Sequence, residues 1–127
     1  MINEKKSQKN VLGEKLETCS EEPLTGWFRD GCCNTNDEDK GIHTVCVKVT
    51  TQFLEWGKVV GNDLITPHPE FGFPGLKDGD RWCVCAFWYA KSIKDGTACP
   101  VYLKRTNEKT LQLIPIEKLK KYAIDLS

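Results

Sequence analysis

The residues best suited to chemistry are seven cysteines, in a chain of 127 residues that has only two histidines. Cysteine serves proteins as a metal ligand, a reactive thiol, a disulfide partner, or a small buried apolar side chain. The adjacent pair Cys32 and Cys33 fits the packing role least well, because its neighbours in FRDGCCNTND are turn formers. The full set is Cys19, Cys32, Cys33, Cys46, Cys83, Cys85 and Cys99.

A zinc site is the first hypothesis for these side chains. Zinc takes four ligands, which places neighbouring sulfur atoms roughly 3.8 Å apart. The sequence has no Cys-x-x-Cys motif, and on a flat strand Cys83 and Cys85 share a face with their α-carbons about 6.6 Å apart. This spacing permits a metal site without requiring one. The predicted ligands are Cys32, Cys33, His43, Cys46, Cys83 and Cys85.

A reactive thiol is the second hypothesis, with Cys33 or Cys32 as the nucleophile and His43 as its catalytic partner. Arg29 in the same loop would favour a thiolate, whereas the neighbouring Asp30 would oppose it. Such a thiol would serve redox or acyl-transfer chemistry. The sequence leaves open whether the protein is an enzyme.

The expected compartment bears on the two remaining roles. The start of the chain, MINEKKSQKN, has no apolar stretch of signal-peptide length, and no run approaches the ~18 apolar residues of a membrane span. We therefore expect a cytoplasmic protein that contacts no membrane. Stable disulfides are uncommon there and seven is an odd number, so a disulfide framework is the least favoured role. Packing suits Cys83 and Cys85 in a buried strand.

Composition and charge exclude one class of partner. Basic and acidic residues both number 18, so the formal net charge is zero. Nucleic-acid binding usually needs a strong basic excess, and we therefore expect no nucleic-acid partner. The length suits one domain. We predict a disordered polar tail over residues 1–10 and a single globular domain over residues 11–127.

The expected fold class is α+β, with a mainly antiparallel sheet, about two helices and two long ordered loops rich in glycine and proline. Alternating β-branched residues predict a strand over residues 42–50, and apolar residues at helical spacing predict a helix within 50–61, capped by Thr50 or Thr51 and ended by Gly61. RWCVCAFWYA, residues 81–90, predicts a strand that is buried on both faces. Further strands are expected within 11–19, 98–106 and 109–115, a second helix within 116–126, and the two loops over 20–41 and 62–80.

Four segments of the chain together resemble one family of small proteins: NVLGEKLETCS, PLTGWFRDGCCN, HTVCVKVT and GNDLITPHPEFGFPGLKDGDRWCVCA. The family is domain of unknown function 2237, and the resemblance covers nearly all of residues 10–125. It implies a stand-alone domain of bacteria and some eukaryotes, and it carries over no catalytic residue. The family pattern often has histidine where this chain has Asn107 and Tyr122, so any role of those histidines is absent here.

These observations favour a small cytoplasmic binding or regulatory domain. Its two loops would fold over one end of the sheet and form a cysteine-rich pocket for a small molecule or a protein, with zinc as a possible cofactor. The alternative is a small thiol-dependent enzyme that uses Cys33 or Cys32 with His43. Geometry discriminates between them: a metal site needs four converging side chains, whereas an enzyme needs one exposed thiol near His43 and a cavity beside it.

Overall fold

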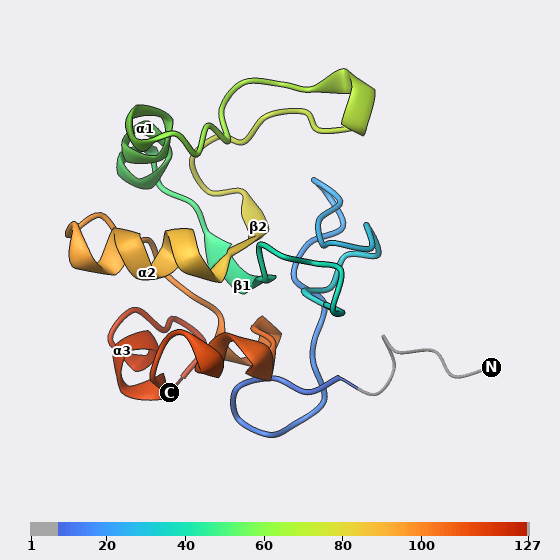
Figure 1. Cartoon of the computed structure of the whole chain (residues 1–127), viewed down its shortest axis with the longest axis vertical. Helices are drawn as coiled ribbons and strands as arrows, with labels where there is room; N and C mark the ends of the chain where they lie inside the picture. Colours follow the sequence, from blue (N-terminus) through green and yellow to red (C-terminus); the bar gives the residue numbers. More distant parts are fainter. Residues whose placement is uncertain (1–7, 127) are drawn as a thin grey trace.

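The computed structural model describes residues 8–126 and has three α-helices and one two-stranded antiparallel sheet in that part of the chain (Figure 1). The predicted α+β class is confirmed. The strands are β1 (His43–Lys48) and β2 (Arg81–Cys85), and the helices are α1 (Thr51–Val60), α2 (Ala86–Lys94) and α3 (Ile116–Lys120). Short 3-10 helices are η2 (Pro69–Phe71), η3 (Leu103–Arg105) and η4 (Glu108–Gln112).

The register between β1 and β2 determines which of their side chains lie next to each other. Val45 lies opposite Val84, and Cys46 lies opposite Cys83. A register irregularity between His43 and Val45 adds one residue to β1, and His43 then pairs with Cys85. The β-branched residues of β1 are fully buried, as their alternation predicts.

The predicted helix after β1 is also confirmed. The Oγ1 of Thr50 caps α1 by accepting a hydrogen bond from the N–H of Phe53 at 3.1 Å, and Gly61 ends the helix in the left-handed region. Gly57 lies inside α1 at a cost in helix propensity. The structure gives its reason, because a Cβ at Gly57 would lie 2.7 Å from the backbone oxygen of Asn62.

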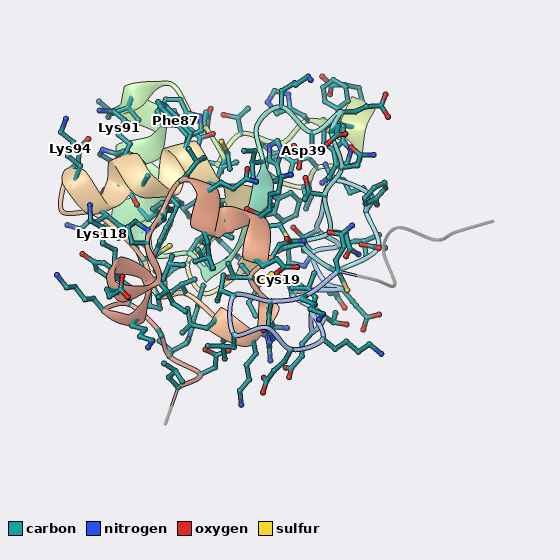
Figure 2. All side chains as sticks on the ribbon, turned by 60° about the horizontal axis from the view of Figure 1, so that its bottom comes forward. Cys19, Asp39, Phe87, Lys91, Lys94 and Lys118 are labelled. Carbon is teal, nitrogen blue, oxygen red and sulfur yellow. A yellow bond between two sulfur atoms is a disulfide. The ribbon has the colours of Figure 1, made fainter. Side chains whose placement is uncertain are left out.

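The predicted strand over residues 81–90 is wrong beyond Cys85, where the chain turns directly into α2. Ala86, Tyr89 and Ser92 are buried at helical spacing, while Lys91 and Lys94 project from the opposite side (Figure 2). The Tyr89 hydroxyl donates to the backbone oxygen of Cys99 at 2.6 Å. Burial raises the pKa of Tyr89, so this hydroxyl remains a donor.

Three other predicted strands are wrong as well. The segment 98–106 forms single bridges and η3, and the segment 109–115 forms η4. The segment 11–19 has turns and a single bridge, at Lys15, in place of a strand. The predicted C-terminal helix is present, but it covers only Ile116–Lys120. The antiparallel sheet therefore consists of β1 and β2 alone among the described residues.

The packed part of the chain begins before the predicted boundary at residue 11. Asn10 is fully buried, and its Oδ1 accepts from the backbone N–H groups of Leu12 and Glu14. Its Nδ2 donates to the backbone oxygens of Lys15 and Lys104. Residues 1–7 of the predicted tail lie outside the described residues.

The two long loops pack against the sheet on one side of the molecule (Figure 1). We call residues 20–41 the first loop and residues 62–80 the second loop. In the second loop, Phe73 and Leu76 join the hydrophobic core, and the Phe73 ring contacts Trp82 of β2 edge-on at 5.2 Å. None of the helices within residues 8–126 is both apolar enough and long enough to cross a membrane.

Candidate functional site

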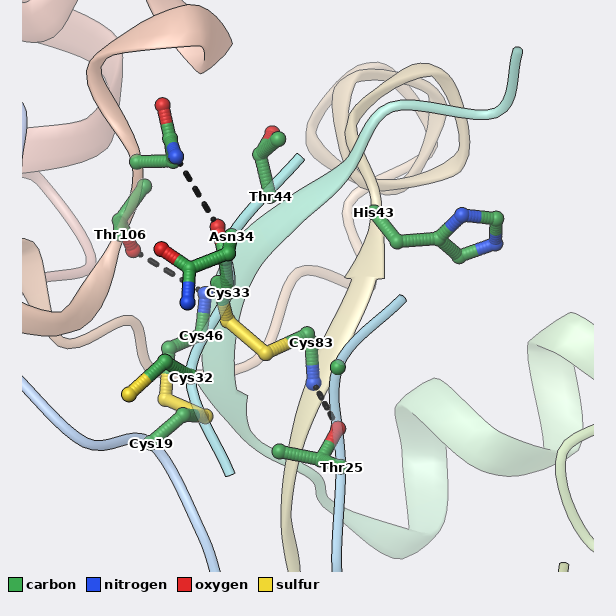
Figure 3. The surroundings of a disulfide bond; sticks show 12 residues. Cys19, Thr25, Cys32, Cys33, Asn34, His43, Thr44, Cys46, Cys83 and Thr106 are labelled. Atoms are coloured by element: carbon green, nitrogen blue, oxygen red, sulfur yellow. Dashed lines mark hydrogen bonds between the residues drawn. A yellow bond between two sulfur atoms is a disulfide. The ribbon is translucent and has the colours of Figure 1, made fainter. Parts of the chain in front are cut away.

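Four cysteines form a buried sulfur cluster between the first loop and the sheet (Figure 3). Disulfides join Cys19 to Cys46 and Cys33 to Cys83. The Sγ atoms of Cys19, Cys33 and Cys46 all lie within 4.8 Å of one another. The prediction that disulfides are the least favoured role is therefore wrong for these four residues. The strand register explains the cluster, because it brings Cys46 and Cys83 together beneath the first loop.

Polar side chains hold the backbone around this cluster. The Oγ1 of Thr25 accepts from the N–H of Cys83 at 2.8 Å, and both groups are buried. The Nδ2 of Asn107 donates to the backbone oxygen of Cys33 at 3.1 Å. Asn107 thus has a structural role at a position where the family pattern often has histidine. Satisfied polar groups of this kind fix the first loop in one arrangement.

The cluster brings together only part of the predicted metal set. Cys33, Cys46 and Cys83 are members, together with Cys19, which the prediction omitted. His43, Cys32 and Cys85 belong to neither disulfide, and the His43 ring points away from the sulfur atoms (Figure 3). Reduced to thiols, the clustered cysteines are a group that could hold a metal ion.

The predicted thiol pair is not brought to His43. Cys33 has no free thiol, because it is bonded to Cys83. The Cys32 sulfur lies 3.8 Å from the Oγ1 of Thr18, on the opposite side of the disulfides from His43 (Figure 3). Burial raises the pKa of Cys32, and the nearby carboxylate of Asp30 adds to this effect, while the hydrogen bond with Thr18 opposes it. Cys32 is therefore held in its weakly nucleophilic thiol form.

His43 is oriented by a buried carboxylate. Its Nδ1 lies 2.6 Å from the Oδ1 of Asp39, whose side chain is fully buried. The Oδ2 of Asp39 accepts from the N–H of His43 at 2.8 Å and from the Oγ1 of Thr35 at 3.0 Å. Because a carboxylate oxygen accepts hydrogen bonds, this contact favours the imidazole tautomer with the proton on Nδ1 and with Nε2 as an acceptor. Asp39 was not among the predicted site residues, because it lies in a stretch of acidic residues.

Two neighbours complete the setting of the His43 ring. The Trp27 ring stacks on it, with a centroid separation of 6.0 Å and an interplanar angle of 14°. A Cβ at Gly41 would lie 2.7 Å from the Cε1 of His43, so glycine leaves the space that the ring occupies. Asp39, Trp27 and Gly41 thus define the position of the ring, and the His43 side chain is still 40% exposed.

Cys85 is the free thiol that lies on the same side as His43. It pairs with His43 across the sheet, ends β2 and is the N-cap residue of α2. Directly paired residues of an antiparallel sheet have Cβ atoms about 5 Å apart. Within residues 8–126, its half-buried thiol has neither a disulfide nor a hydrogen-bond partner. The prediction placed Cys85 among metal ligands and did not consider it as a nucleophile.

His43 and Cys85 both line a cavity of about 400 Å³ between the two long loops. The first loop contributes Arg29 and Gly41 to its wall, and α2 contributes Trp88. The remaining lining residues come from the second loop and β2: Asn62, Asp63, Leu64, His68, Phe71, Phe73, Trp82, Cys83 and Val84. The cavity therefore combines a free thiol, an oriented imidazole and an aromatic wall.

The start of α2 adds hydrogen-bond donors beside the Cys85 thiol. The N–H of Ala86 donates to the backbone oxygen of Ile42 at 2.9 Å. The N–H groups of Phe87 and Trp88 lie in the first turn, where an α-helix supplies no internal acceptor, and no side chain caps this end. These donors and the helix dipole favour negative charge close to the sulfur atom.

Comparison with known proteins supports the resemblance seen in the sequence. The profile of domain of unknown function 2237, described as an uncharacterized protein conserved in bacteria, matches residues 9–123. The comparison with curated proteins finds no match. The matched segment covers nearly the whole chain and includes the residues of the cysteine cluster and of the cavity. The chain belongs to the domain of unknown function 2237 family.

Proposed function

We propose that this protein is a small thiol-dependent acyl-transfer enzyme, with Cys85 as nucleophile and His43 as general base. Asp39 is a positioning residue that fixes the tautomer and the orientation of His43. The proposal keeps His43 and the chemistry of the alternative hypothesis, but it replaces Cys32 and Cys33. The observation that carries it is the meeting of a free thiol and a carboxylate-oriented imidazole at one cavity.

The proposed cycle consists of acyl transfer and hydrolysis, and it involves no oxidation or reduction. The Nε2 of His43 takes the thiol proton while the Cys85 sulfur attacks the carbonyl carbon of an ester, thioester or amide. The bond to the leaving group then breaks, and His43 returns the proton to the leaving atom. Water next attacks the thioester, with His43 again as base. This second half releases a carboxylic acid and restores the thiol.

The first turn of α2 supports this chemistry by offering hydrogen-bond donors to the carbonyl oxygen of the acyl donor. Attack by sulfur places negative charge on the carbonyl oxygen, which must be stabilised close to the nucleophile. The N–H groups of Phe87 and Trp88 lie in the first turn of the helix that Cys85 caps, and they have no helical acceptors. They are the groups that would bind this oxygen.

Acetylation by p-nitrophenyl acetate tests the proposal. We expect a burst of about one nitrophenol per chain, with the acetyl group located on Cys85 by peptide mass spectrometry. Cys85→Ser should abolish the burst, and Cys32→Ser, which removes the other half-buried thiol, should leave it intact. Burial strongly raises the pKa of Cys99, so this third free thiol should stay unmodified. Acetylation of Cys32, or of no cysteine, would contradict the proposal and favour the binding or regulatory domain that the sequence predicts.

The sulfur cluster favours a second proposal, which concerns the reduced protein. We propose that Cys19, Cys33, Cys46 and Cys83 bind one zinc ion after both disulfides are reduced. The Sγ atoms of Cys19, Cys33 and Cys46 lie within 4.8 Å of one another, and Cys83 is bonded to Cys33, so small shifts would bring the four sulfur atoms to the roughly 3.8 Å of a tetrahedral site. Two dithiol molecules supply the four electrons and four protons that reduce both disulfides, each dithiol being oxidised to a disulfide, and zinc then displaces the four thiol protons. The proposal suits the reducing cytoplasm that the sequence suggests.

Zinc content in the two redox states tests this second proposal. Protein reduced by a dithiol and incubated with zinc under argon should retain about one zinc per chain after gel filtration, whereas oxidised protein should retain none. Cys19→Ser should lose the metal, and Cys85→Ser should keep it, because Cys85 is outside the cluster. A reduced protein that keeps its circular dichroism spectrum and retains no zinc would contradict the proposal.

A further inference from the structure

Arg29 is an unusual member of the cavity wall. It lies in the first loop, close to the His43 ring, and it lines the same cavity as Cys85. Its backbone has a φ of 53°, in the left-handed region that residues other than glycine rarely adopt. A strained residue of this kind persists only where the surrounding structure holds it, and such residues cluster at functional sites. The strained backbone therefore suggests a function for the Arg29 side chain.

The Arg29 guanidinium is held by an aromatic ring and a carbonyl, and not by an acid. Its Cζ lies 5.1 Å from the centroid of the Trp82 ring, and its Nη1 donates to the backbone oxygen of Gly26 at 3.3 Å. No carboxylate within residues 8–126 forms an ion pair with it. One carbonyl contact leaves most of the donors of a guanidinium available. The cavity wall thus carries a positive charge that forms no ion pair with the described residues.

The carboxylates of the neighbouring residue in the chain, of the cavity wall and of the His43 site have other partners. Asp30 accepts from the N–H of Cys32 and from the Nδ2 of Asn34. In the cavity wall, Asp63 accepts from two backbone N–H groups and from the Oγ1 of Thr66, and these bonds lower the pKa of its carboxyl. Asp39 is bound to His43 as described above. Each of these carboxylates is hydrogen-bonded to groups of its own loop or to His43. The Arg29 guanidinium is therefore available to a ligand that enters the cavity.

The surroundings of Arg29 indicate the shape of that group. The Trp82 ring lies under the guanidinium, and Phe73 packs edge-on against Trp82. A carboxylate offers two oxygens in one plane, which match the two parallel N–H groups of a guanidinium. The aromatic wall beside it suits the hydrocarbon part of a small molecule.

We propose that Arg29 binds a carboxylate of the substrate, so that the acyl donor is a small organic acid derivative with one free carboxylate and one reactive carbonyl. The inference rests on the proposed thiol chemistry, because Cys85 attacks the carbonyl while Arg29 holds the other end. It makes Arg29 a specificity-determining residue. A neutral acyl donor of the same size would react more slowly, since it leaves the guanidinium unpaired.

Two alkylating reagents of nearly equal size test this inference without knowledge of the substrate. Iodoacetate carries a carboxylate and iodoacetamide does not, and each forms a carbon–sulfur bond with Cys85 and releases iodide. The measured quantity is the ratio of the iodoacetate rate to the iodoacetamide rate at Cys85. We expect this ratio to fall about tenfold in Arg29→Gln, because the iodoacetate rate should fall much more than the iodoacetamide rate. The ratio of the unmodified protein should also fall as salt is raised.

Arg105 provides a matched control. Its guanidinium also lies over an aromatic ring, 4.6 Å from the centroid of Tyr102, but it does not line the cavity. Arg105→Gln removes the same charge and should leave the ratio unchanged. Arg29→Lys keeps the charge without the planar fork and should retain an intermediate ratio. Near-ultraviolet circular dichroism establishes that each variant is folded.

The possible outcomes distinguish a failure of the proposed role of Arg29 from a failure of the proposed thiol chemistry of Cys85. An equal ratio in Arg29→Gln and the unmodified protein, with fast iodoacetamide reaction at Cys85, overturns the substrate class and leaves the thiol chemistry standing. Slow iodoacetamide reaction at Cys85 overturns the thiol chemistry, whatever the ratio. An equal fall in Arg29→Gln and Arg105→Gln shows a general charge effect and also overturns the role of Arg29.

Discussion

His43→Ala is expected to slow the acetylation of Cys85 by p-nitrophenyl acetate by a factor of about one hundred or more. Without the imidazole, no base remains opposite the thiol to take its proton as the sulfur attacks. The rate is measured from the nitrophenol burst, and the site of modification is measured by peptide mass spectrometry. Asp39→Asn should give a smaller loss, because the imidazole remains but its tautomer and orientation are no longer fixed.

His68→Ala is the matched control for this result. His68 is the other histidine of the chain, it also lines the cavity, and its Nδ1 lies 3.6 Å from Glu70 in the second loop. Its removal should leave the burst rate close to that of the unmodified protein. Gly41→Ala tests position in place of chemistry, since the new Cβ would lie 2.7 Å from the Cε1 of His43 and displace the ring. Equal losses in His43→Ala and His68→Ala would contradict the assignment of His43.

Removal of the Cys33–Cys83 disulfide by Cys33→Ala with Cys83→Ala is expected to lower the free energy of unfolding by about 4 kcal/mol. The two residues are 50 apart in sequence, and opening a loop of that length returns a large conformational entropy to the unfolded chain. Urea unfolding followed by tryptophan fluorescence measures the change. The burst at Cys85 should also weaken, because Cys83 lines the cavity and Cys33 anchors the loop that carries Arg29.

Two variants establish whether this loss comes from the bond itself. Cys32→Ala removes the adjacent thiol and leaves both disulfides in place, so its unfolding midpoint should barely move. Cys19→Ala with Cys46→Ala opens a shorter loop, of 27 residues, and should cost about 3.5 kcal/mol. If the Cys33 and Cys83 double variant is as stable as Cys32→Ala, these two cysteines are not bonded in solution.

The elements that could be predicted from sequence are those whose local pattern agrees with their environment. β1 alternates β-branched residues and is buried where the pattern predicts. α1 has a capping threonine, apolar residues at helical spacing and a glycine after its last turn. For these two elements, local preference and tertiary packing favour the same structure, so both could be predicted from this sequence alone.

The site was harder to predict because it depends on where one element changes into another. Residues 81–90 are apolar on both faces of a strand, and a helix can bury Ala86 and Tyr89 equally well. The change of structure at Cys85 turns this residue from a packed strand position into a thiol at a helix start. No periodicity in a run this short identifies such a change, and the nucleophile was therefore missed.

The disulfides were missed for a different reason. Their partners are 27 and 50 residues apart, so the pairing is set by strand register and by the path of the first loop. The expected compartment then weighed against disulfides. Asp39 was overlooked in a stretch of acidic residues, where only the fold distinguishes the buried carboxylate from its exposed neighbours.

The two disulfides interleave along the chain, since Cys33 lies between Cys19 and Cys46 while Cys83 lies beyond both. Every peptide bond between Cys19 and Cys83 is therefore spanned by at least one sulfur–sulfur bond. A protease that cuts once anywhere in the two long loops adds the mass of one water molecule and separates nothing. The fragments come apart only in the presence of a reductant, so this protein can tolerate a nick beside its own cavity and remain one covalent molecule.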